Sequence, residues 1–148
     1  MATTKTPTKV WSDAERAAMK EGARERKKSS RLTPDEERAQ GEADIQAKIA
    51  DMPEADRQLA RRIHELILKT VPALMPKTYY GMPAYARDGK TVCFFKPASK
   101  FKERYSTLGF EQHAHLDDGA MWPTSYALVK LTTADEAKIA ALVKKAAG

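Results

Sequence analysis

The stretch from Tyr79 to Phe95, YYGMPAYARDGKTVCFF, decides how this sequence folds. Asp88-Gly89 separates two β-prone runs, and this dipeptide accepts the positive φ angles of a type I′ turn. In the second run, from Thr91 to Phe95, apolar side chains alternate onto both faces, which is typical of a strand buried on both sides. We therefore predict a β-hairpin whose second strand lies at the centre of the sheet.

The first run of this hairpin contains Gly81, Met82 and Pro83. Because proline has no N–H to donate to a neighbouring strand, Pro83 indicates an edge strand or a β-bulge, with Gly81 supplying the backbone freedom. We interpret this interruption as a device of the fold, and its aromatic neighbours as the wall of a pocket.

Helical patterns lie on both sides of the β-rich region. The segment Thr33-Pro34-Asp35-Glu36 is a capping box with proline in the first turn, so a helix begins there, with Gly41 as a point of interruption. From Glu54 onward, apolar residues at helical spacing predict a stronger helix with two buried flanks. Another capping box, Thr133-Ala134-Asp135-Glu136, opens a C-terminal helix.

Two further strands are predicted, from Arg104 to Phe110 and from Ser125 to Leu131. The order along the chain is therefore helices, then a β-meander, then a helix. This order predicts an α+β fold, a two-layer sandwich in which helices pack on a largely antiparallel sheet of about four to five strands.

The first 38 residues differ from the rest in composition. They hold ten Lys/Arg against seven Asp/Glu, and Trp11 is their only aromatic residue. A capping box at Ser12 and pairs of opposite charge three residues apart support a helix to about residue 28. We predict a basic, solvated helical extension over residues 1–38, loosely attached to an α+β domain over residues 39–148.

The 148 residues carry a net charge of +6 and one cysteine. No apolar run approaches the roughly 18 residues needed to span a bilayer, and the N-terminus lacks the apolar core of a signal peptide. We therefore expect a cytoplasmic protein without a membrane partner, and a monomer.

Signatures of known catalytic sites are absent from the sequence: it has no Gly-rich phosphate loop, no nucleophile elbow and no zinc-protease motif. Cys93 lies within a predicted apolar strand, where a thiol is normally inert. These observations favour a protein that is not an enzyme.

The segment EQHAHLDDG contains the residues best suited to bind a metal, namely His113, His115, Asp117 and Asp118. If the segment is extended, the first three side chains point to one face, and two imidazoles with a carboxylate are ligands for Fe²⁺ or Zn²⁺. The alternative is a polar loop with solvated histidines. A second group of acids is explained first by helix dipoles; its members are Glu42, Asp44, Asp51, Glu54 and Asp56.

The segment FFKPASKFKERY places Lys96, Lys100, Lys102 and Arg104 among aromatic residues. Cations beside aromatic rings suit a nucleic-acid strand or a small phosphorylated ligand. A solvated loop whose aromatic rings turn inward explains the same pattern, and with no complete RNA-binding motif we do not expect nucleic acid as the main partner.

The segments YYGMPAYARDGKTVCFFKPASKFKERYSTLGF and LDDGAMWPTSYAL resemble the YdhG-like family, long catalogued as a domain of unknown function. The resemblance runs from about residue 42 to the C-terminus. It implies a compact α+β domain similar to the frataxin fold. Some members are described as intracellular iron chaperones, which implies weak iron binding and delivery to a partner in iron–sulfur cluster or haem assembly.

Three functions follow as hypotheses. The first is a frataxin-like iron carrier with His113, His115, Asp117 and Asp118 as ligands, since exposed hard ligands release iron readily. The second is a module that binds a small ligand or a protein. The third is an anion or nucleic-acid binder that uses the loop from Lys96 to Arg104. The pocket of the second would be lined by Tyr79, Tyr80, Met82, Pro83, Tyr85 and Trp122.

Overall fold

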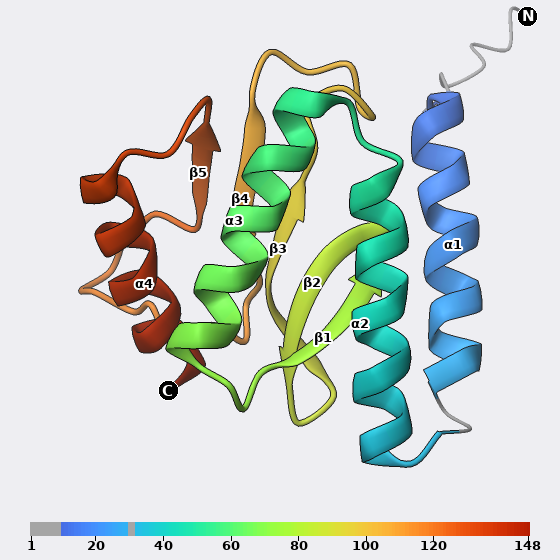
Figure 1. Ribbon diagram of the computed structural model, residues 1–148. Coiled ribbons are helices and arrows are strands. Elements are labelled where there is room, and N and C mark those ends of the chain that lie inside the picture. The colour runs from blue at the N-terminus through green and yellow to red at the C-terminus, as the bar shows by residue number, and fades with distance from the viewer. Residues whose placement is uncertain (1–9, 30–31) are drawn as a thin grey trace, which may run out of the picture.

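The computed structural model describes residues 10–29 and 32–148 and has the α+β fold expected from the sequence (Figure 1). Sequence expectations for residues 1–9 and 30–31, including the absence of a signal-peptide core, lie outside the described residues. The elements in chain order are α1 (Asp13–Ser29), α2 (Pro34–Ala50), α3 (Glu54–Thr70), β1 (Met75–Tyr79), β2 (Met82–Arg87), β3 (Lys90–Lys96), β4 (Ser106–Phe110), β5 (Ser125–Leu128) and α4 (Thr133–Ala147).

The sheet is a five-stranded antiparallel meander in the order β1-β2-β3-β4-β5. Asp88 and Gly89 have φ angles of 52° and 77°, so the predicted type I′ turn joins β2 and β3. The strand β3 pairs with β2 on one side and β4 on the other, and the prediction that it lies centrally is confirmed.

A second hairpin, which the sequence reading missed, joins β1 and β2 through Tyr80 and Gly81. Their φ angles are 50° and 77°, again the conformation of a type I′ turn. Gly81 therefore lies in a turn, and the prediction that it lies inside a strand is wrong. Since Tyr79 and Met82 close this hairpin, Pro83 opposite Thr78 occupies the next, non-hydrogen-bonded pair, where its missing N–H removes no bond to β1.

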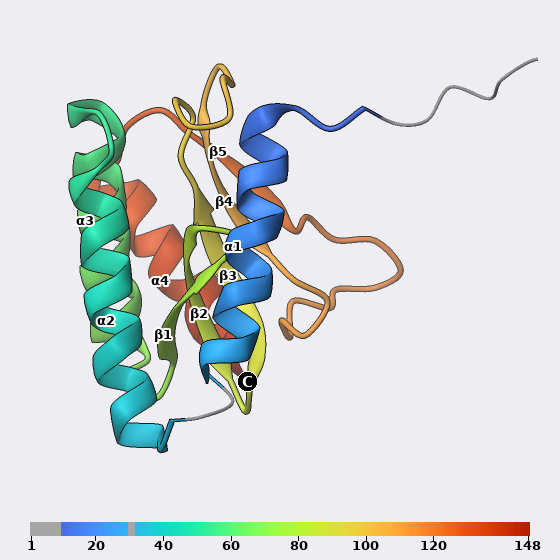
Figure 2. The same ribbon diagram turned by 90° about the vertical axis from the view of Figure 1, so that its right-hand side faces the viewer.

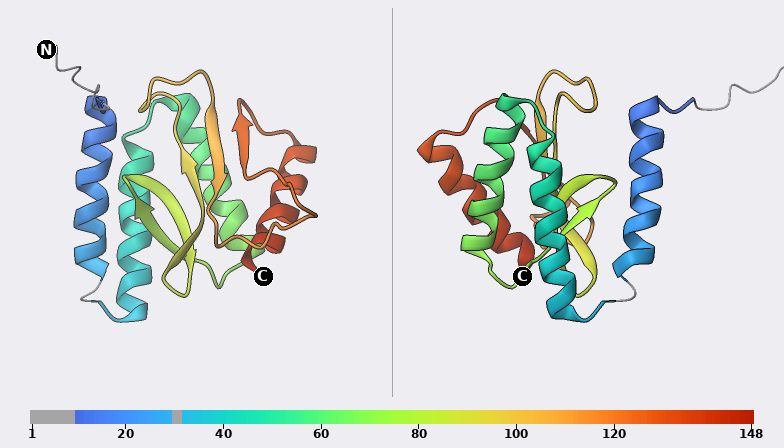
Figure 3. Two further views of the ribbon diagram at one scale, coloured as in Figure 1. Left: turned by 180° about the vertical axis from the view of Figure 1, so that it is seen from behind. Right: turned by 45° about the vertical axis from the view of Figure 1, so that its right-hand side comes forward.

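Three helices form a layer on one face of the sheet, consistent with the two-layer sandwich expected from the sequence. The helices α2, α3 and α4 cover one face. The helix α1 lies on the opposite face, at the β1–β2 end of the sheet (Figures 2 and 3). The core fills the space under the first group, where Ile45 and Ile49 of α2 meet Ile63 and Ile67 of α3, all fully buried. The apolar face predicted for α3 is therefore the one that packs.

The helix α2 runs unbroken through Gly41, although the sequence suggested an interruption there. A Cβ atom on Gly41 would lie 1.9 Å from the carbonyl oxygen of Pro76, so glycine allows α2 to approach β1 closely. The sequence placed the boundary between the N-terminal extension and the α+β domain at residues 38 and 39. This position falls inside α2, because the helix that begins after the cap at Thr33 continues to Ala50.

Element ends differ from the sequence expectations by a few residues. Thr132, not Thr133, is the N-cap of α4, and its side chain and that of Asp135 form the capping box. The strand β4 begins at Ser106, and β5 ends at Leu128. None of the helices in the described part of the chain is long and apolar enough to cross a membrane.

Candidate functional site

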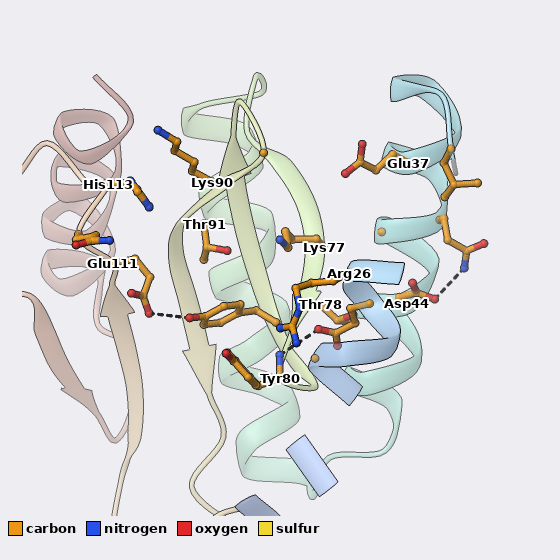
Figure 4. A pocket seen from close by; sticks show the side chains of 18 residues that line it. Arg26, Glu37, Asp44, Lys77, Thr78, Tyr80, Lys90, Thr91, Glu111 and His113 are labelled. Atoms are coloured by element: carbon orange, nitrogen blue, oxygen red, sulfur yellow. Dashed lines mark hydrogen bonds between the residues drawn. The ribbon is translucent and has the colours of Figure 1, made fainter. Parts of the chain in front are cut away.

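A cleft of about 400 Å³ lies where α1, α2, β1 and the start of β3 meet the segment after β4 (Figure 4). Its volume is within the range of small-molecule sites in proteins. The lining residues come from five separate segments of the chain and are Gly22, Glu25, Arg26, Leu32, Glu37, Gln40, Gly41, Asp44, Lys77, Thr78, Tyr79, Tyr80, Gly89, Lys90, Thr91, Glu111, Gln112 and His113.

Charged groups of both signs line this cleft. Glu37 and Asp44 stand on α2, whereas Lys90 and His113 stand across the cleft, with Lys77 between the two groups (Figure 4). Asp44 accepts a hydrogen bond from Gln40 Nε2 at 2.8 Å. The cleft therefore offers two carboxylates on the α2 side and Lys90 and His113 on the other side, where the carboxylate of Glu111 already accepts a hydrogen bond from Tyr79.

Glu37 and Lys77 are both half-buried, and neither forms an ion pair within residues 10–29 and 32–148. The exposed Lys90 likewise has no ion-pair partner among these residues. A charged side chain that loses part of its hydration without gaining a partner is energetically unfavourable. These groups are therefore available to a ligand with charges of both signs.

Tyr79 lines the cleft and donates a hydrogen bond from its hydroxyl to Glu111 Oε1 at 3.3 Å. Burial, followed by the negative charge of Glu111, raises the pKa of Tyr79 to about 12. The ring packs near Tyr80 and Phe94, with centroid distances of 4.6 and 5.8 Å. The phenol is therefore neutral at physiological pH and supplies an ordered apolar surface with a polar edge.

The helix α1 forms one wall of the cleft, and it does so through specific contacts rather than the loose attachment expected from its composition. The carboxylate of Glu25 accepts hydrogen bonds from the backbone N–H groups of Tyr80 and Gly81, both at 3.1 Å. Ala18 and Gly22 are buried against the rest of the protein. The sequence could not indicate this docking, because the partner lies more than 50 residues away.

The six residues predicted to line a pocket do not share one. Tyr79 and Tyr80 line the cleft, whereas Met82, Pro83 and Tyr85 are buried and Trp122 packs on the core from the segment between β4 and β5. Alternation along β2 places Tyr85 on the face toward α3, where its hydroxyl meets His64. The predicted set thus combined two residues of the cleft with four residues that belong to the core or pack on it.

Three of the four predicted metal ligands line a second cleft of about 480 Å³. His113, His115 and Asp117 lie there with Asp88, while Asp118 is exposed on the same loop and outside the lining. No three His, Cys, Asp or Glu side chains of the described residues are arranged so that they could hold a metal ion. The structure therefore brings the predicted residues near one another without forming a coordination site.

The predicted anion-binding cations are largely engaged inside the protein. Lys96 pairs with Glu103 at 2.5 Å and lies over the ring of Phe101, and Arg104 lies over the ring of Tyr105. Lys100 also lies over Phe101, and its Nζ donates a hydrogen bond to the carbonyl oxygen of Gly81 at 3.3 Å. Lys102 is exposed and occupies a turn with a φ angle of 53°.

The acidic group between residues 42 and 56 is mostly structural. Asp56 is buried and accepts hydrogen bonds from Ser99 N at 3.0 Å and Ser106 Oγ at 3.4 Å, which ties α3 to the segment between β3 and β4. Glu54 pairs with Arg57 at 2.7 Å. Only Asp44 of this group lines the first cleft.

The single cysteine is not a candidate nucleophile. Cys93 is fully buried in β3, and this burial raises the pKa of its thiol to about 12. The thiolate is therefore negligible near neutral pH, which agrees with the inert role assigned from the sequence.

Comparisons with known proteins found no match: no family model matches the chain, and neither a curated protein nor a solved structure does. The resemblance to the YdhG-like family and the iron-carrier role it implies stay predictions.

Proposed function

We propose that this protein is a binding protein, not an enzyme, which holds a small amphoteric molecule in the cleft between α1, α2 and the sheet. The ligand class is a compact molecule that carries an ammonium and a carboxylate, such as an amino acid or a short peptide. Its ammonium group would face Glu37 and Asp44, and its carboxylate would face Lys77 and Lys90.

The observation that supports this proposal most directly is the half-buried pair Glu37 and Lys77, which face one cleft without an ion-pair partner among the described residues. A ligand with both charges would compensate both groups at once. A ligand with one charge would leave the other group unpaired and would bind more weakly, since charge-assisted hydrogen bonds are stronger than neutral ones.

Thermal unfolding with a panel of ligands tests the proposal. The panel contains amino acids and dipeptides, together with alkylamines and carboxylic acids of matched size. At a concentration of about 100 times Kd, a ligand stabilises the folded state by about 2.7 kcal/mol. For a chain of this size this corresponds to an increase in Tm of roughly 5–10 °C. We expect this increase for an amphoteric member of the panel.

Variants with one charge removed identify the site. Lys77→Met and Glu37→Gln should each reduce the ligand-induced increase in Tm, whereas Lys130→Met removes an exposed lysine outside the cleft and should leave it unchanged. If singly charged analogues stabilise the protein as strongly as amphoteric ones, or if no member of the panel raises Tm, the proposal is wrong.

The iron-carrier function is a second candidate, supported by the shared lining of the second cleft by His113, His115 and Asp117. Rotation of exposed side chains would be needed to bring three ligands onto one ion. Iron would then be bound weakly by exposed groups, as expected of a carrier that releases its cargo.

Anaerobic titration with Fe²⁺, followed by NMR, tests this second function. Paramagnetic broadening should be centred on residues 113–117, and His113→Ala with His115→Ala should abolish it. Because Tyr80 lines only the first cleft, its amide signal is the internal control. A spectrum unchanged at millimolar Fe²⁺ would contradict iron binding, without bearing on the amphoteric ligand.

A further inference from the structure

The contacts of α1 are those of a ligand seated in a charged groove. Glu25 occupies the two backbone N–H groups of the Tyr80-Gly81 turn, both at 3.1 Å. One turn earlier, Glu21 Oε2 lies 2.8 Å from Lys48 Nζ and 4.0 Å from Lys100 Nζ. Consecutive amides with positive φ form a concave anion site, and here two lysines extend it. We call these groups, with the ring of Tyr80, the carboxylate groove.

The spacing of the contacts on α1 is specific. A Cβ atom on Gly22 would lie 2.8 Å from Cδ1 of Tyr80, so even alanine at this position would require the ring to shift. The recognised pattern is therefore Glu21-Gly22-Ala23-Arg24-Glu25, in which two carboxylates one helical turn apart flank a small residue.

The attachment of α1 has little apolar support. Among its described side chains, Ala18 is the only buried apolar one, and the remaining buried position is Gly22. Apolar burial contributes roughly 25 cal/mol per Å², so a single alanine stabilises the docked helix only slightly. Half-buried Ala14 and Met19 add some apolar contact, and the carboxylates of Glu21 and Glu25 supply the polar contacts described above.

Glu21 is bound by lysine side chains and not by backbone amides. Its Oε2 is buried, and its partner is the ammonium group of Lys48 at 2.8 Å. Burial also lowers the pKa of Lys100, an effect that the charge of Glu21 opposes, so the lysine itself favours a nearby carboxylate.

We propose that the carboxylate groove is a docking surface for a helix of a partner protein that presents Glu-small-x-x-Glu, and that α1 is an internal occupant which this helix displaces. The partner helix binds where α1 lies now, with its carboxylates on the Tyr80-Gly81 amides and on Lys48 and Lys100. A partner helix would remove the wall that α1 gives to the cleft, so a ligand in the cleft should favour docked α1 and oppose the partner. The test below is carried out without such a ligand and therefore does not depend on the small-molecule proposal.

The test uses the full-length chain and a fluorescent peptide of residues 12–29 as the probe. In wild type the groove is occupied by α1, so the peptide binds weakly. The double variant Glu21→Gln/Glu25→Gln weakens the internal helix and frees the groove. Fluorescence anisotropy should then show the peptide binding at least tenfold more tightly to the double variant than to wild type.

Matched controls separate recognition from unfolding. A peptide with Gln at positions 21 and 25 has nearly the same helix propensity and should not bind. Lys100→Met in the double variant should remove peptide binding, and Lys48→Met gives the same information if Lys100→Met does not fold. Circular dichroism of each variant reports its folding.

Three results would overturn the proposal. They are equal affinity of wild type and double variant for the peptide, equal binding of the Gln peptide, and a stable dimer of the wild-type chain in light scattering that the double variant loses. The last result would identify the occupant as α1 of a second copy instead of a partner protein.

Discussion

His64 connects three elements through its two ring nitrogens. Its Nε2 lies 2.8 and 2.9 Å from the carboxylate oxygens of Glu42 in α2, and its Nδ1 lies 2.8 Å from the hydroxyl of Tyr85 in β2. An ionised carboxylate only accepts, so Nε2 carries the hydrogen, and in the neutral ring Nδ1 accepts from Tyr85. Because Tyr85 is fully buried, this network is structural and gives no substrate access to the phenol.

Tyr85→Phe should lower the free energy of unfolding by about 1–3 kcal/mol, because it leaves Nδ1 of buried His64 without its hydrogen-bond partner. Urea denaturation at pH 7 measures the change. Tyr105→Phe is the matched control, since its ring is half-exposed and its hydroxyl has no hydrogen bond to a described residue. A loss equal to that of the control would mean that the network contributes nothing.

The carboxylate of Glu42 makes this network sensitive to acid. Burial alone would raise its pKa, but hydrogen bonds from Gln46 and His64 and the charge of His64 together hold it below the usual 4.5. A carboxyl whose pKa is lower in the folded state stabilises the protein above its unfolded pKa, and this contribution is lost as the pH falls through the folded pKa.

Glu42→Gln should therefore reduce the free energy of unfolding at pH 7, and the difference from wild type should shrink once the pH falls below about 4.5. Urea denaturation of both proteins between pH 3 and 7 measures this. A difference that is constant over the range would show that the charge of Glu42 is not the cause.

At the scale of elements, glycines permit the close approaches that hold the sheet and helices together. A Cβ atom on Gly41 would lie 1.9 Å from the oxygen and 2.8 Å from the carbon of the Pro76 carbonyl. Both obstructing atoms are backbone, so no side-chain rotation can make room. The α2–β1 contact therefore depends on the absence of one methyl group.

Gly41→Ala should destabilise the protein by about 1–3 kcal/mol, as overpacking does, although alanine is the better helix former by about 1 kcal/mol. Thermal or urea unfolding measures the sign and size of this change in the free energy of unfolding. Ala43→Gly is the reverse change at an exposed position of the same helix and should show the propensity effect alone. A stabilised Gly41→Ala variant would show that α2 lies farther from β1 than the structure places it.

The elements themselves were largely predictable. Asp88-Gly89 and the cap at Thr33 act through atoms within a few residues of each other, so the hairpin and the start of α2 could be recognised from sequence. The Tyr80-Gly81 turn was missed because tyrosine is a poor signal for positive φ. In the folded chain, the N–H groups of both turn residues donate hydrogen bonds to Glu25, a contact that the local sequence does not indicate.

At the scale of the whole molecule, stability is distributed unevenly. The helix α3 contributes fully buried Ile63 and Ile67 to the core, whereas the described residues of α1 bury only Ala18 and Gly22. Elements with few buried apolar contacts open with lower free energy than the core. The protein therefore combines an α+β core of high local stability with the helix α1, which buries little apolar surface and contacts the core through carboxylates.

Native-state hydrogen exchange should reveal this order. Amides of α1 should exchange through a local opening whose free energy is below that of global unfolding, while those of α3 should exchange only on global unfolding. Added salt should lower the protection of α1 more than that of α3, because the half-buried Glu21–Lys48 pair that helps to hold α1 is still partly screened. Equal protection of the two helices would contradict the displaceable α1.

The candidate site was only partly predictable for a similar reason. Tyr79 and Tyr80 were among the six residues predicted to line a pocket, and they do line the cleft. Glu37, Lys77 and Lys90 did not stand out, because single charges on separate segments resemble any solvated surface. No local signal distinguishes them before the chain is folded.

The sequence by itself determined the α+β class, the Asp88-Gly89 hairpin and the apolar face of α3, since these follow from turn chemistry, capping and periodicity over a few residues. Only the tertiary structure decided that α1 docks through Glu21 and Glu25, and that charges from five segments face one cleft. The physical reason is that electrostatic complementarity depends on distances in space, and residues as far apart as Glu25 and Gly81 meet only in the folded chain.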